Sequence, residues 1–415
     1  MENKELKPKI RFKGYDCSAD DIKFSEIIDK KIDNRGFTPN FYIKGKHPLI
    51  EVAAVGERKP NYKNVVKYLD DNAFDNQLRE YIQENDILYS TVGSVGEVTL
   101  MDDNKMAAIA QNIVGFRCKA NFDSKYIYSL LSTEKSRRIA NSIVMSAVQP
   151  SIKIPQLLNC KLIVTSDLNE QVLIGKFFEN IDNLINSKKR ELDKWKGIKA
   201  SFLSKMFPKP GSRVPELRFK GFSREWEYTK IEGIATFLHG NGISWNDVNN
   251  NGKYECILYG NLYTDYGMII EDEINYRTNR VLTRPVFSQK GDVLIPSSDT
   301  TPTGLARATS IEKEGVILGG GINIIRPIDG VNGSYLSLLI NCYKKELIKL
   351  IKGTTVRHIY NDDIKLIQLP ITKNLKEQIA IVKLFKIIDK NINLQQQKLE
   401  KLKQIKQSFL SKMFV

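Results

Sequence analysis

A fixed repeat of 207 residues constrains the fold of this chain more than any other feature of its sequence. Residues 171–207 align without a gap on residues 378–414, and both segments end in Ser-Phe-Leu-Ser-Lys-Met-Phe. The same offset carries residues 8–15 onto residues 215–222, whereas the stretches between these anchors differ. A period this long is far beyond that of a solenoid, and 415 residues exceed what one hydrophobic core organises. The sequence therefore predicts a duplicated domain with two matching frameworks and two different heads.

The repeated segments carry apolar residues at alternating steps of four and three, which is the spacing of a heptad seam. Polar residues interrupt the seam at matching places, Lys188 with Gln395 and Lys199 with Lys406. Each segment predicts a helix roughly 55 Å long, and a single apolar stripe on such a helix needs a partner. We expect the two copies to pair as an antiparallel coiled coil related by a pseudo-two-fold axis. The expected seam residues are Ile174, Phe178, Ile181, Ile185, Leu192, Trp195, Ile381, Phe385, Ile388, Ile392, Leu399 and Leu402.

The segments before each helix predict mixed α and β structure, so the expected fold class is α+β. Residues 86–93 and 292–298 are short apolar strands that end in turns of small residues. The further expected elements are strands at 108–118, 162–165, 320–327 and 366–370, and helices at 125–131 and 334–351. Two prolines and a glycine at 208–211 end the first helix. We therefore expect a head at 1–168, a spacer helix at 169–207, a linker at 208–213, a second head at 214–373 and a second spacer helix at 374–415.

The charge balance indicates a polyanionic partner. The 63 Lys and Arg residues outnumber the 48 Asp and Glu residues, which gives a net charge of +15 and a pI of about 9.3. A basic but merely solvated surface is the alternative. The five cysteines are scattered and odd in number, as expected in a reducing compartment. Because the sequence shows neither a signal peptide nor an apolar run of roughly 18 residues, we expect a cytoplasmic protein.

Sequence motifs that carry catalysis are missing. The sequence has no Gly-x-x-x-x-Gly-Lys-Ser/Thr loop, and its three histidines and dispersed cysteines lack metal-ligand spacing. The glycines at 319–321 predict a tight turn or bulge, and residues 93–96 predict a turn at a strand end. No Asn/Asp-Pro-Pro-aromatic tetrapeptide is present. We therefore expect no catalytic residues, and neither a metal nor a cofactor bound by this chain.

The sequence does contain the residue types that recognise nucleic acids. Cations bind phosphates, and amide, hydroxyl, arginine or histidine groups contact base edges. Loops at corresponding places in both heads gather these residue types, although each residue alone fits a solvated turn or a helix cap equally well. The DNA-binding candidates of the first head are Arg58, Lys59, Asn61, Tyr62, Lys63, Ser90, Thr91, Ser94, Gln111, Asn112 and Gln149. Those of the second head are Tyr276, Arg277, Thr278, Arg280, Arg284, Ser297, Ser298, Thr300, Thr301, Arg357 and His358.

Apolar residues near the ends of the helices allow two interpretations. The residues are Phe202, Leu203, Phe207, Phe409, Leu410 and Phe414. In the first interpretation they pack against the neighbouring head. In the second they stay exposed and dock a partner subunit, because some of them lie off the seam.

The motifs, in order and twice, resemble those of type I restriction–modification specificity subunits. The segments that carry the resemblance are 214–222 with Trp226, 86–93, 109–112, 375–379, 202–207 and 409–414. The first head departs from the pattern at 17–20, where Cys-Ser-Ala-Asp replaces the aromatic turn of the second head. The resemblance covers essentially the whole chain.

The resemblance implies two target-recognition domains that read the two halves of an asymmetric site in double-stranded DNA. It also implies assembly with methyltransferase (modification) subunits, expected to be two, and with a restriction subunit that translocates DNA. The chain itself would be non-catalytic. The partners would use S-adenosylmethionine, ATP and Mg²⁺, and the helix ends would dock the methyltransferase subunits.

The paired helices suggest a ruler, because heads held about 40–60 Å apart would each enter a major groove that recurs about every 34–36 Å. Three alternatives stay open at this point. The chain could be the recognition subunit of another multi-subunit DNA-modifying system. It could be a methyltransferase or nuclease with an unrecognised active site, or a coiled-coil scaffold that binds no DNA.

Overall fold

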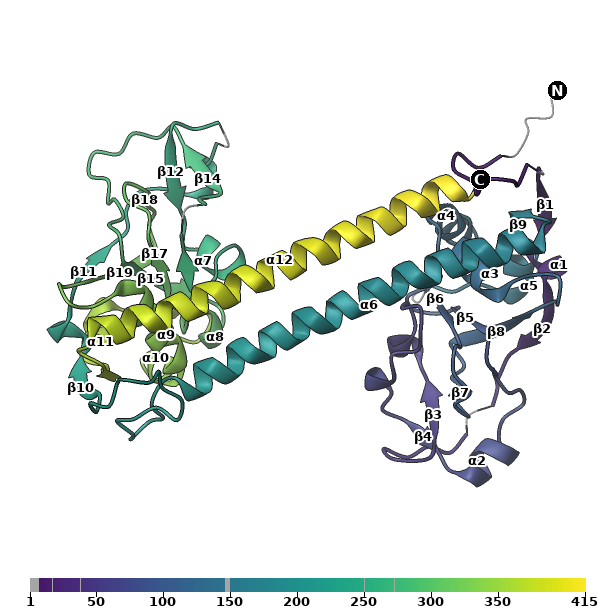
Figure 1. Cartoon of the computed structure of the whole chain (residues 1–415), viewed down its shortest axis with the longest axis horizontal. Coiled ribbons are helices and arrows are strands. Elements are labelled where there is room, and N and C mark those ends of the chain that lie inside the picture. The colour runs from purple at the N-terminus through teal and green to yellow at the C-terminus, as the bar shows by residue number, and fades with distance from the viewer. Residues whose placement is uncertain (1–6, 17, 38, 146–149, 250, 272) are drawn as a thin grey trace. The chain divides into compact units, whose positions relative to one another are not determined.

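The computed structural model describes residues 7–415 apart from 17, 38, 146–149, 250 and 272. It contains two compact units, Met1–Arg190 with Gln396–Val415, and Glu191–Gln395. The division falls within both long helices (Figure 1). Each unit therefore holds one head, the beginning of the helix that follows it and the end of the other helix.

The first unit holds short strands and helices followed by one long helix. Its elements are β1 (Ala19–Lys23), α1 (Phe24–Ile27), β2 (Ile28–Ile32), β3 (His47–Ile50), η1 (Val52–Ala54), η2 (Tyr62–Asn64), β4 (Tyr68–Leu69), α2 (Asp71–Asn76), β5 (Ile87–Ser90), β6 (Val98–Leu100), β7 (Ala108–Ile109), β8 (Ile113–Cys118), α3 (Ser124–Leu131), α4 (Glu134–Ser142), α5 (Ile154–Leu158), β9 (Lys161–Thr165) and the start of α6 (Leu168–Lys205). Strands β2-β8-β5-β6 form an antiparallel sheet, and β4-β3-β7 form a smaller one with a parallel β3–β7 pair. Strands β1 and β9 pair on their own.

The second unit repeats this order with additions. Its elements are β10 (Glu227–Lys230), η3 (Ile231–Gly233), β11 (Ala235–His239), η4 (Trp245–Asp247), β12 (Tyr254–Ile257), α7 (Asn261–Thr264), β13 (Ile269–Ile270), β14 (Tyr276–Thr278), β15 (Asp292–Pro296), β16 (Ser298–Asp299), α8 (Pro302–Leu305), β17 (Thr309–Ile311), β18 (Ile317–Leu318), β19 (Ile322–Pro327), α9 (Gly333–Cys342), α10 (Lys344–Lys349), β20 (Arg357–His358), α11 (Asn361–Ile364), β21 (Gln368–Ile371) and the start of α12 (Leu375–Met413). Strands β11-β19-β15-β17-β13 form the larger sheet and β14-β12-β18 the smaller one. Strands β10 and β21 pair as β1 and β9 do, and β16 pairs with β20.

The central strand of each larger sheet is buried on both faces, which explains its continuous apolar sequence. In β5, Ile87 and Tyr89 pack in the core next to α3 and the long helices, whereas Leu88 faces the core shared with the smaller sheet. In β15, Val293 packs in the core beside α9 and Leu294 in the core of the smaller sheet. In both heads the smaller sheet lies farther from the long helices than the larger sheet (Figure 1).

The two long helices pair antiparallel within each unit. In the first unit the ring of Phe178 stacks on that of Phe414 at a centroid distance of 5.8 Å, and the Lys406 ammonium lies 2.6 Å from the Asp182 carboxylate. In the second unit the Lys199 ammonium lies 2.5 Å from the Asp389 carboxylate. Residue numbers rise along one helix as they fall along the other, which confirms the expected fold class of two mixed heads with paired spacer helices.

The expected seam residues are mostly hidden from solvent. Those that are buried are Ile174, Phe178, Ile181, Leu192, Ile381, Phe385, Ile388 and Leu399, and those that are half-buried are Ile185, Trp195, Ile392 and Leu402. The first turns of each helix also pack against the head, because Phe178 and Phe385 belong to the head cores. None of the helices in the described part of the chain combines the length and apolar character that a bilayer crossing requires.

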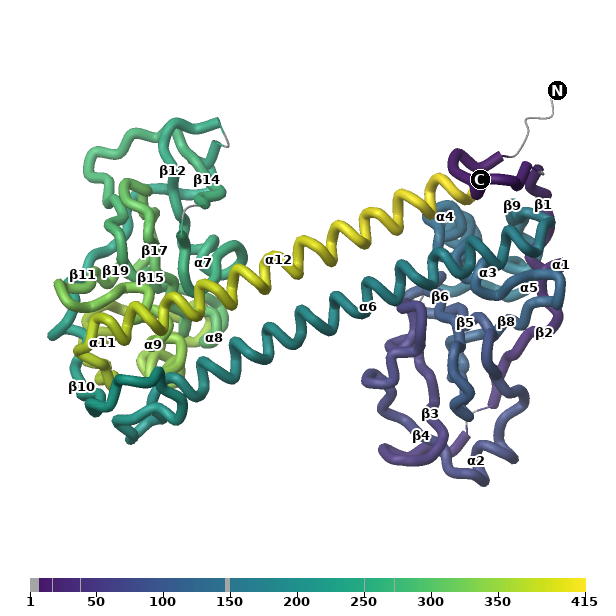
Figure 2. Tube along the Cα trace, in the orientation of Figure 1, coloured from purple at the N-terminus to yellow at the C-terminus, as the bar shows by residue number. Residues whose placement is uncertain are grey.

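An extended segment caps the last turn of each long helix. The amide of Ile10 donates to the carbonyl of Lys412 at 3.0 Å, and the amide of Leu217 donates to the carbonyl of Lys205 at 2.8 Å. These bonds satisfy carbonyl groups that have no partner within a helix end. The trace in Figure 2 shows the beginning of the described chain beside the end of α12. The anchors repeated in the sequence are thus the segments that join head to helix.

One expectation about local structure was wrong, and several short elements were not expected. The expected helix at 334–351 is two helices, α9 and α10, because the chain turns at Tyr343, whose hydroxyl donates to the carbonyl of Pro208 at 2.6 Å. The smaller sheets and the strands β1 and β10 were not expected. Most of their strands are only two to five residues long, so they offer too short a window for a periodic signal.

Candidate nucleic-acid interface

In the second head, several recognition candidates meet at one end of the larger sheet. The segment after β15 runs through Ser297 and then pairs β16 with β20, which sets Ser298 opposite His358 and Asp299 opposite Arg357. The amide of Ser297 donates to the carbonyl of Gly321 just before β19 (2.8 Å), and the amide of Ile359 just after β20 donates to the carbonyl of Ser297 (3.0 Å). The sequence candidates Ser297, Ser298, Thr300, Thr301, Arg357 and His358 therefore form one cluster, the sheet-end loops of the second head.

Internal hydrogen bonds shape these sheet-end loops. The Arg357 guanidinium donates to the carbonyl of Thr300, and the Thr301 hydroxyl donates to Asp299 at 3.1 Å. The Tyr263 hydroxyl donates to the carbonyl of Ser298 at 2.7 Å, and burial raises the pKa of this phenol, which keeps it a neutral donor. The side chains of Thr300 and Thr301 remain exposed, and that of Arg357 is half-buried. The loops thus present hydroxyl groups and a cation on an ordered backbone.

The glycines at 319–321 form the turn between β18 and β19, as expected. Gly321 has φ of +79°, and a Cβ atom there would lie 3.0 Å from the ring of Tyr259. At the neighbouring Gly240, a Cβ atom would come within 2.0 Å of the Gly319 carbonyl oxygen. The close backbone approach at this end of the sheet therefore requires glycine.

The first head builds the corresponding end of its larger sheet from different side chains. Thr91 follows β5, and its amide donates to the carbonyl of Asn112 at 2.8 Å, just before β8. The Gln111 side-chain amide lies 3.4 Å from the carbonyl of Phe37. Ser94 and Asn112 are exposed and Gln111 is half-buried. Gln149, the remaining candidate of this region, lies outside the described residues. We refer to this region as the sheet-end loops of the first head.

Two DNA-binding candidates of the first head, Ser90 and Thr91, have structural roles inside the head. Ser90 and Thr91 are buried, with at most 1% of their surface exposed. The Ser90 hydroxyl donates to the carbonyl of Ser94 at 2.5 Å and accepts from the amide of Glu97 at 2.9 Å. These bonds hold the turn after β5. The Thr91 hydroxyl donates to the carbonyl of Asn112 at 3.2 Å, so it too is engaged within the head.

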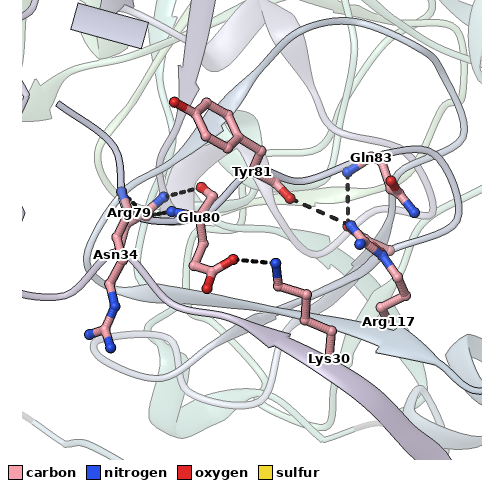
Figure 3. A network of polar contacts seen from close by, with 8 residues as sticks. Lys30, Asn34, Arg79, Glu80, Tyr81, Gln83 and Arg117 are labelled. Carbon is pink, nitrogen blue, oxygen red and sulfur yellow. Dashed lines mark hydrogen bonds and ion pairs between the residues drawn. The ribbon is translucent and has the colours of Figure 1, made fainter. Parts of the chain in front are cut away.

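A polar network fixes the segment after α2 at the end of β2. The Asn34 side chain accepts from the amides of Arg79 and Glu80 at 3.2 and 2.9 Å and donates to the Glu80 carbonyl at 3.1 Å. Lys30 reaches the Glu80 carboxylate at 2.6 Å. Figure 3 shows these residues together with Arg117, which lies on β8. The network orders one side of the sheet-end loops without using an exposed recognition residue.

The basic loop expected to bind phosphates is largely turned inward. The Arg58 guanidinium is 1% exposed and pairs with Glu179 of α6 at 3.0 Å, so it lies inside the head and not on its surface. Lys59 pairs with Asp102, and the Asn61 side chain caps η2. The Tyr62 hydroxyl donates to Asp103 at 3.1 Å, and burial raises the pKa of this phenol. Lys63 is exposed, and the described residues offer it no ion pair.

The arginine-rich strand of the second head is not part of the sheet-end loops. Its residues Tyr276, Arg277 and Thr278 form β14 in the smaller sheet. Arg277 donates to the carbonyl of Gly252 at 2.7 Å, and the Thr278 hydroxyl is engaged by a backbone carbonyl. Hydrogen bonds from Arg280, followed by those from the Ser244 amide and hydroxyl, lower the pKa of Asp247 to about 2.

The hydrogen bonds to the Asp247 carboxylate hold the loop before β12 against β14. Among the described residues of this strand and the loop after it, only Arg284 is an exposed arginine without an ion pair. The described residues contain no group of three or more His, Cys, Asp and Glu placed to hold a metal ion.

Comparison with known proteins assigns this architecture. A family model described as the type I restriction modification DNA specificity domain matches residues 21–194 and 223–404. The chain belongs to the type I restriction–modification DNA specificity family.

Relatives of this specificity subunit span nearly its whole length. It is 23% identical over 393 residues to the type I restriction enzyme MjaVIII specificity subunit of Methanocaldococcus jannaschii, with 89% of this chain and 88% of that protein covered. The crystal structure of a type I restriction–modification S subunit from M. genitalium has a TM-score of 0.63 at 16% identity and covers 99% of both chains. A second structure, from work on assembly of the type I R-M system, has a TM-score of 0.53 at 15% identity and covers 95% of this chain and 97% of that chain. As a specificity subunit, the chain supplies DNA recognition and is not a catalytic subunit.

The helix ends of this specificity subunit are packed rather than exposed, in agreement with the first interpretation of their apolar residues. Phe207 is 2% exposed and packs against Trp226 and Tyr335 in the second head. Leu410 and Phe414 are buried in the first head. The half-buried remainder, Phe202, Leu203 and Phe409, pack against the same cores. The expectation that these residues form an exposed docking surface was wrong because they complete the cores of the heads.

Sequence reasoning missed several exposed residues beside the sheet-end loops. Tyr259 and Tyr360 border these loops in the second head, and the Tyr360 ring stacks on that of His358 at 6.1 Å. Phe37 and Met145 are exposed in the first head. The Arg-His-Ile-Tyr sequence of 357–360 was a usable signal for Tyr360. Tyr259 offered none, because it reaches the loops only through the turn at Gly321.

Proposed function

We propose that each head of this specificity subunit reads one half of an asymmetric two-part DNA site through its sheet-end loops. One observation carries the proposal. The sheet-end loops follow corresponding strands in the two heads, but they present different side chains. Ser94, Gln111 and Asn112 belong to these loops in the first head, and Thr300, Thr301 and Arg357 in the second. Two readers with different side chains recognise two different half-sites.

The residue types in these loops match the chemistry of the major groove. An amide side chain such as that of Gln111 or Asn112 makes a bidentate contact with adenine, and an arginine makes one with guanine. Hydroxyl groups accept or donate at several bases or phosphates. The net charge of +15 favours the approach of the phosphate backbone and makes binding fall with rising salt concentration.

The paired helices set the distance between the two half-sites in this proposal. Helices α6 and α12 contain 38 and 39 residues, which corresponds to roughly 57 Å at about 1.5 Å per residue. Each head joins the beginning of its helix through buried contacts, so the helix is a rigid extension of the head. In this proposal each reading surface enters a major groove of its own, with unread base pairs between the two.

The proposal includes assembly with methyltransferase subunits, expected to be two, and with a restriction subunit. In this assembly S-adenosylmethionine, ATP and Mg²⁺ belong to the partners. Because the helix ends are buried, docking falls to apolar residues that stay exposed off the seam. Ile198 and Ile405 are such residues at equivalent positions of α6 and α12, with 38% and 37% of their surface exposed.

Removing one heptad from both helices tests the ruler. Deleting 186–192 together with 393–399 keeps the apolar face aligned, because seven residues are close to two helical turns. It shortens the helices by about 10 Å, or about three base pairs. We expect a methylated motif with the same two halves and an unread spacer about three base pairs shorter, read by mapping methylated bases. Deleting 186–192 alone is the control and should abolish assembly by breaking the seam register. An unchanged spacer in the double deletion contradicts the proposal.

A further inference from the structure

The two long helices carry opposite charges at two pairs of equivalent positions, Glu179 with Lys386 and Glu191 with Lys398. The first pair forms ion pairs with the heads. Glu179 on α6 and Lys386 on α12 are related by the 207-residue offset. Each contacts its own head through an ion pair, and the sign of the charge on the helix is reversed. Glu179 accepts from Arg58 of the first head, whereas the Lys386 ammonium lies 2.8 Å from the Glu271 carboxylate of the second head.

The ion pair between Arg58 and Glu179 in the first head is mostly buried. The Arg58 side chain is 1% exposed, lies over the ring of Tyr128 at 5.6 Å, and reaches the Glu179 carboxylate at 3.0 Å. Its Nε and Nη1 atoms are buried without a hydrogen-bond partner. Glu179 is therefore the carboxylate that compensates this buried cation, and its loss leaves a buried charge unpaired.

Two neighbouring ion pairs attach the same head to α6. Lys125 of α3 lies 2.7 Å from the Glu179 carboxylate, and Lys189 of α6 lies 2.6 Å from the Glu57 carboxylate. Glu57 and Arg58 are adjacent in one loop. The helix thus contacts this loop at two points with opposite charges, which fixes the direction of the loop along the helix.

The contact in the second head is more exposed. The side chains of Lys386 and Glu271 are 28% and 57% exposed, so this pair is screened and contributes less than the buried one. Its polarity is still the reverse of that in the first head. A lysine at the position of Glu179 would face Arg58, and a glutamate at the position of Lys386 would face Glu271.

The ion pairs between the helices do not have this property. Asp182 pairs with Lys406 at 2.6 Å and Lys199 pairs with Asp389 at 2.5 Å, and these two pairs are related by the same offset with unchanged signs. They specify antiparallel pairing but cannot distinguish one helix from the other. The ion pairs of Glu179 and Lys386 with the heads do distinguish the two helices, because their signs are reversed.

We propose that Glu179 and Lys386 are positioning residues whose opposite charges match each head to its own helix and fix its orientation there. This role rests on the proposed function, since the orientation of a head determines which base pairs its sheet-end loops reach. A head placed on the other helix would meet a like charge.

Charge reversal in the full-length chain tests the proposal without DNA. Glu179→Lys gives α6 the residue of α12, and Lys386→Glu does the reverse. Hydrogen exchange is measured at the amides that attach the Arg58 loop, including that of Leu100, which donates to the carbonyl of Arg58 at 2.8 Å. In Glu179→Lys we expect exchange at these amides to rise by about tenfold or more, with no change in the second head. Asp193→Lys, at an exposed position of the same helix, makes the same change in charge and should have no effect.

A second substitution that restores an ion pair with reversed polarity distinguishes loss of charge matching from a general loss of stability. Adding Glu271→Lys to Lys386→Glu should restore the exchange of the second head to the wild-type rate. In a Lys125→Gln background, adding Arg58→Glu to Glu179→Lys should restore that of the first head at least in part. Unchanged exchange in Glu179→Lys, or no recovery in both reversed pairs, would overturn the proposal.

A second measurement uses DNA and the complex with its partner subunits. Glu179→Lys should lower the preference for the native spacer over one a single base pair longer by about tenfold, with unchanged affinity for unrelated DNA. An unaltered spacer preference would count against a positioning role. Failure of the wild-type complex to recognise any two-part site would refute the proposed function, while the exchange result without DNA would still decide the matching of heads and helices.

Discussion

The anchor between head and helix is the same in both units, whereas the sheet-end loops, the proposed reading surface, are not. Arg11 donates to Glu170 at 2.6 and 2.7 Å, and Arg218 donates to Glu377 at 2.6 and 3.0 Å. In each unit the threonine five residues before the glutamate adds a bond of 2.6 Å. The sheet-end loops share strands but hardly any side chains. Duplication has thus preserved the buried polar contacts that place a head and left the exposed groups free to diverge.

The heads also share an internal anchor that the fixed offset does not reveal. Asp86 pairs with Arg117 in the first head, and Asp292 pairs with Arg326 in the second, all at 2.8 to 2.9 Å. Both carboxylates are fully buried at the start of the central strand. Insertions between these residues shift their numbering, so the correspondence appears only in the fold.

The largest effect is expected when the repeated anchor is removed. Glu170→Ala or Glu377→Ala leaves an arginine about nine-tenths buried without its carboxylate, which should lower the free energy of unfolding by about 3–5 kcal/mol. Thermal or urea unfolding of the full chain measures it. The comparison predicts equal costs in the two units, because each glutamate side chain is 1% exposed.

An exposed ion pair provides the control for this prediction. Glu134 and Arg138 are three-quarters exposed on α4, so Glu134→Ala should cost only about 0.3–0.5 kcal/mol. If replacing one anchor glutamate by alanine lowers the free energy of unfolding no more than Glu134→Ala does, the two anchors are not equivalent.

The packing of the two heads can also be compared through the reactivity of one buried cysteine in each. This is the smallest of the expected effects on the protein, because the thiols are probed without changing the cores. Burial raises the pKa of Cys118, at the end of β8, and of Cys342, at the end of α9, to about 12. Because the thiolate is the reactive form, modification of both at pH 8 should be on the order of a thousandfold slower than in the unfolded chain. The rate should rise about tenfold per pH unit, since the pH stays below the pKa.

Mass spectrometry of a Cys17→Ser variant, native and in urea, measures these rates. Similar protection in both heads is expected. A cysteine that reacts at the rate of the unfolded chain would show that its head is less well packed than its counterpart.

The sequence predicted the duplicated plan well, because long amphipathic helices and a gapless repeat give strong signals. It predicted β5, β15 and β19 for a similar reason, since strands buried on both faces are continuously apolar. It did not predict that Arg58 turns toward α6, because the partner lies 121 residues away and only packing brings the two together. It also misjudged Phe207 and Phe414, since an apolar helix end has the same sequence whether it docks a partner or completes a core.

The candidate interface was predicted in part. Residue types at strand ends indicated the sheet-end loops, because a turn after a buried strand is exposed in most folds. The role of Ser90 could not be foreseen, since a hydroxyl that holds a turn and one that contacts a base look alike in sequence. Arg277 was ambiguous in the same way, because its contacts to backbone carbonyls depend on how β12 and β14 pair.

The central claim is that the two heads read independently, and a pair of matched variants tests it most directly. Asn112→Ala alters the sheet-end loops of the first head, and Arg357→Ala those of the second. Methylated bases are mapped in cells that carry each variant of the complex. Each variant should relax about one position of a single half-site, by about 1–3 kcal/mol of discrimination, and leave the other half and the unread spacer unchanged. A variant that alters both halves, or a methylated motif without two parts, would contradict the account.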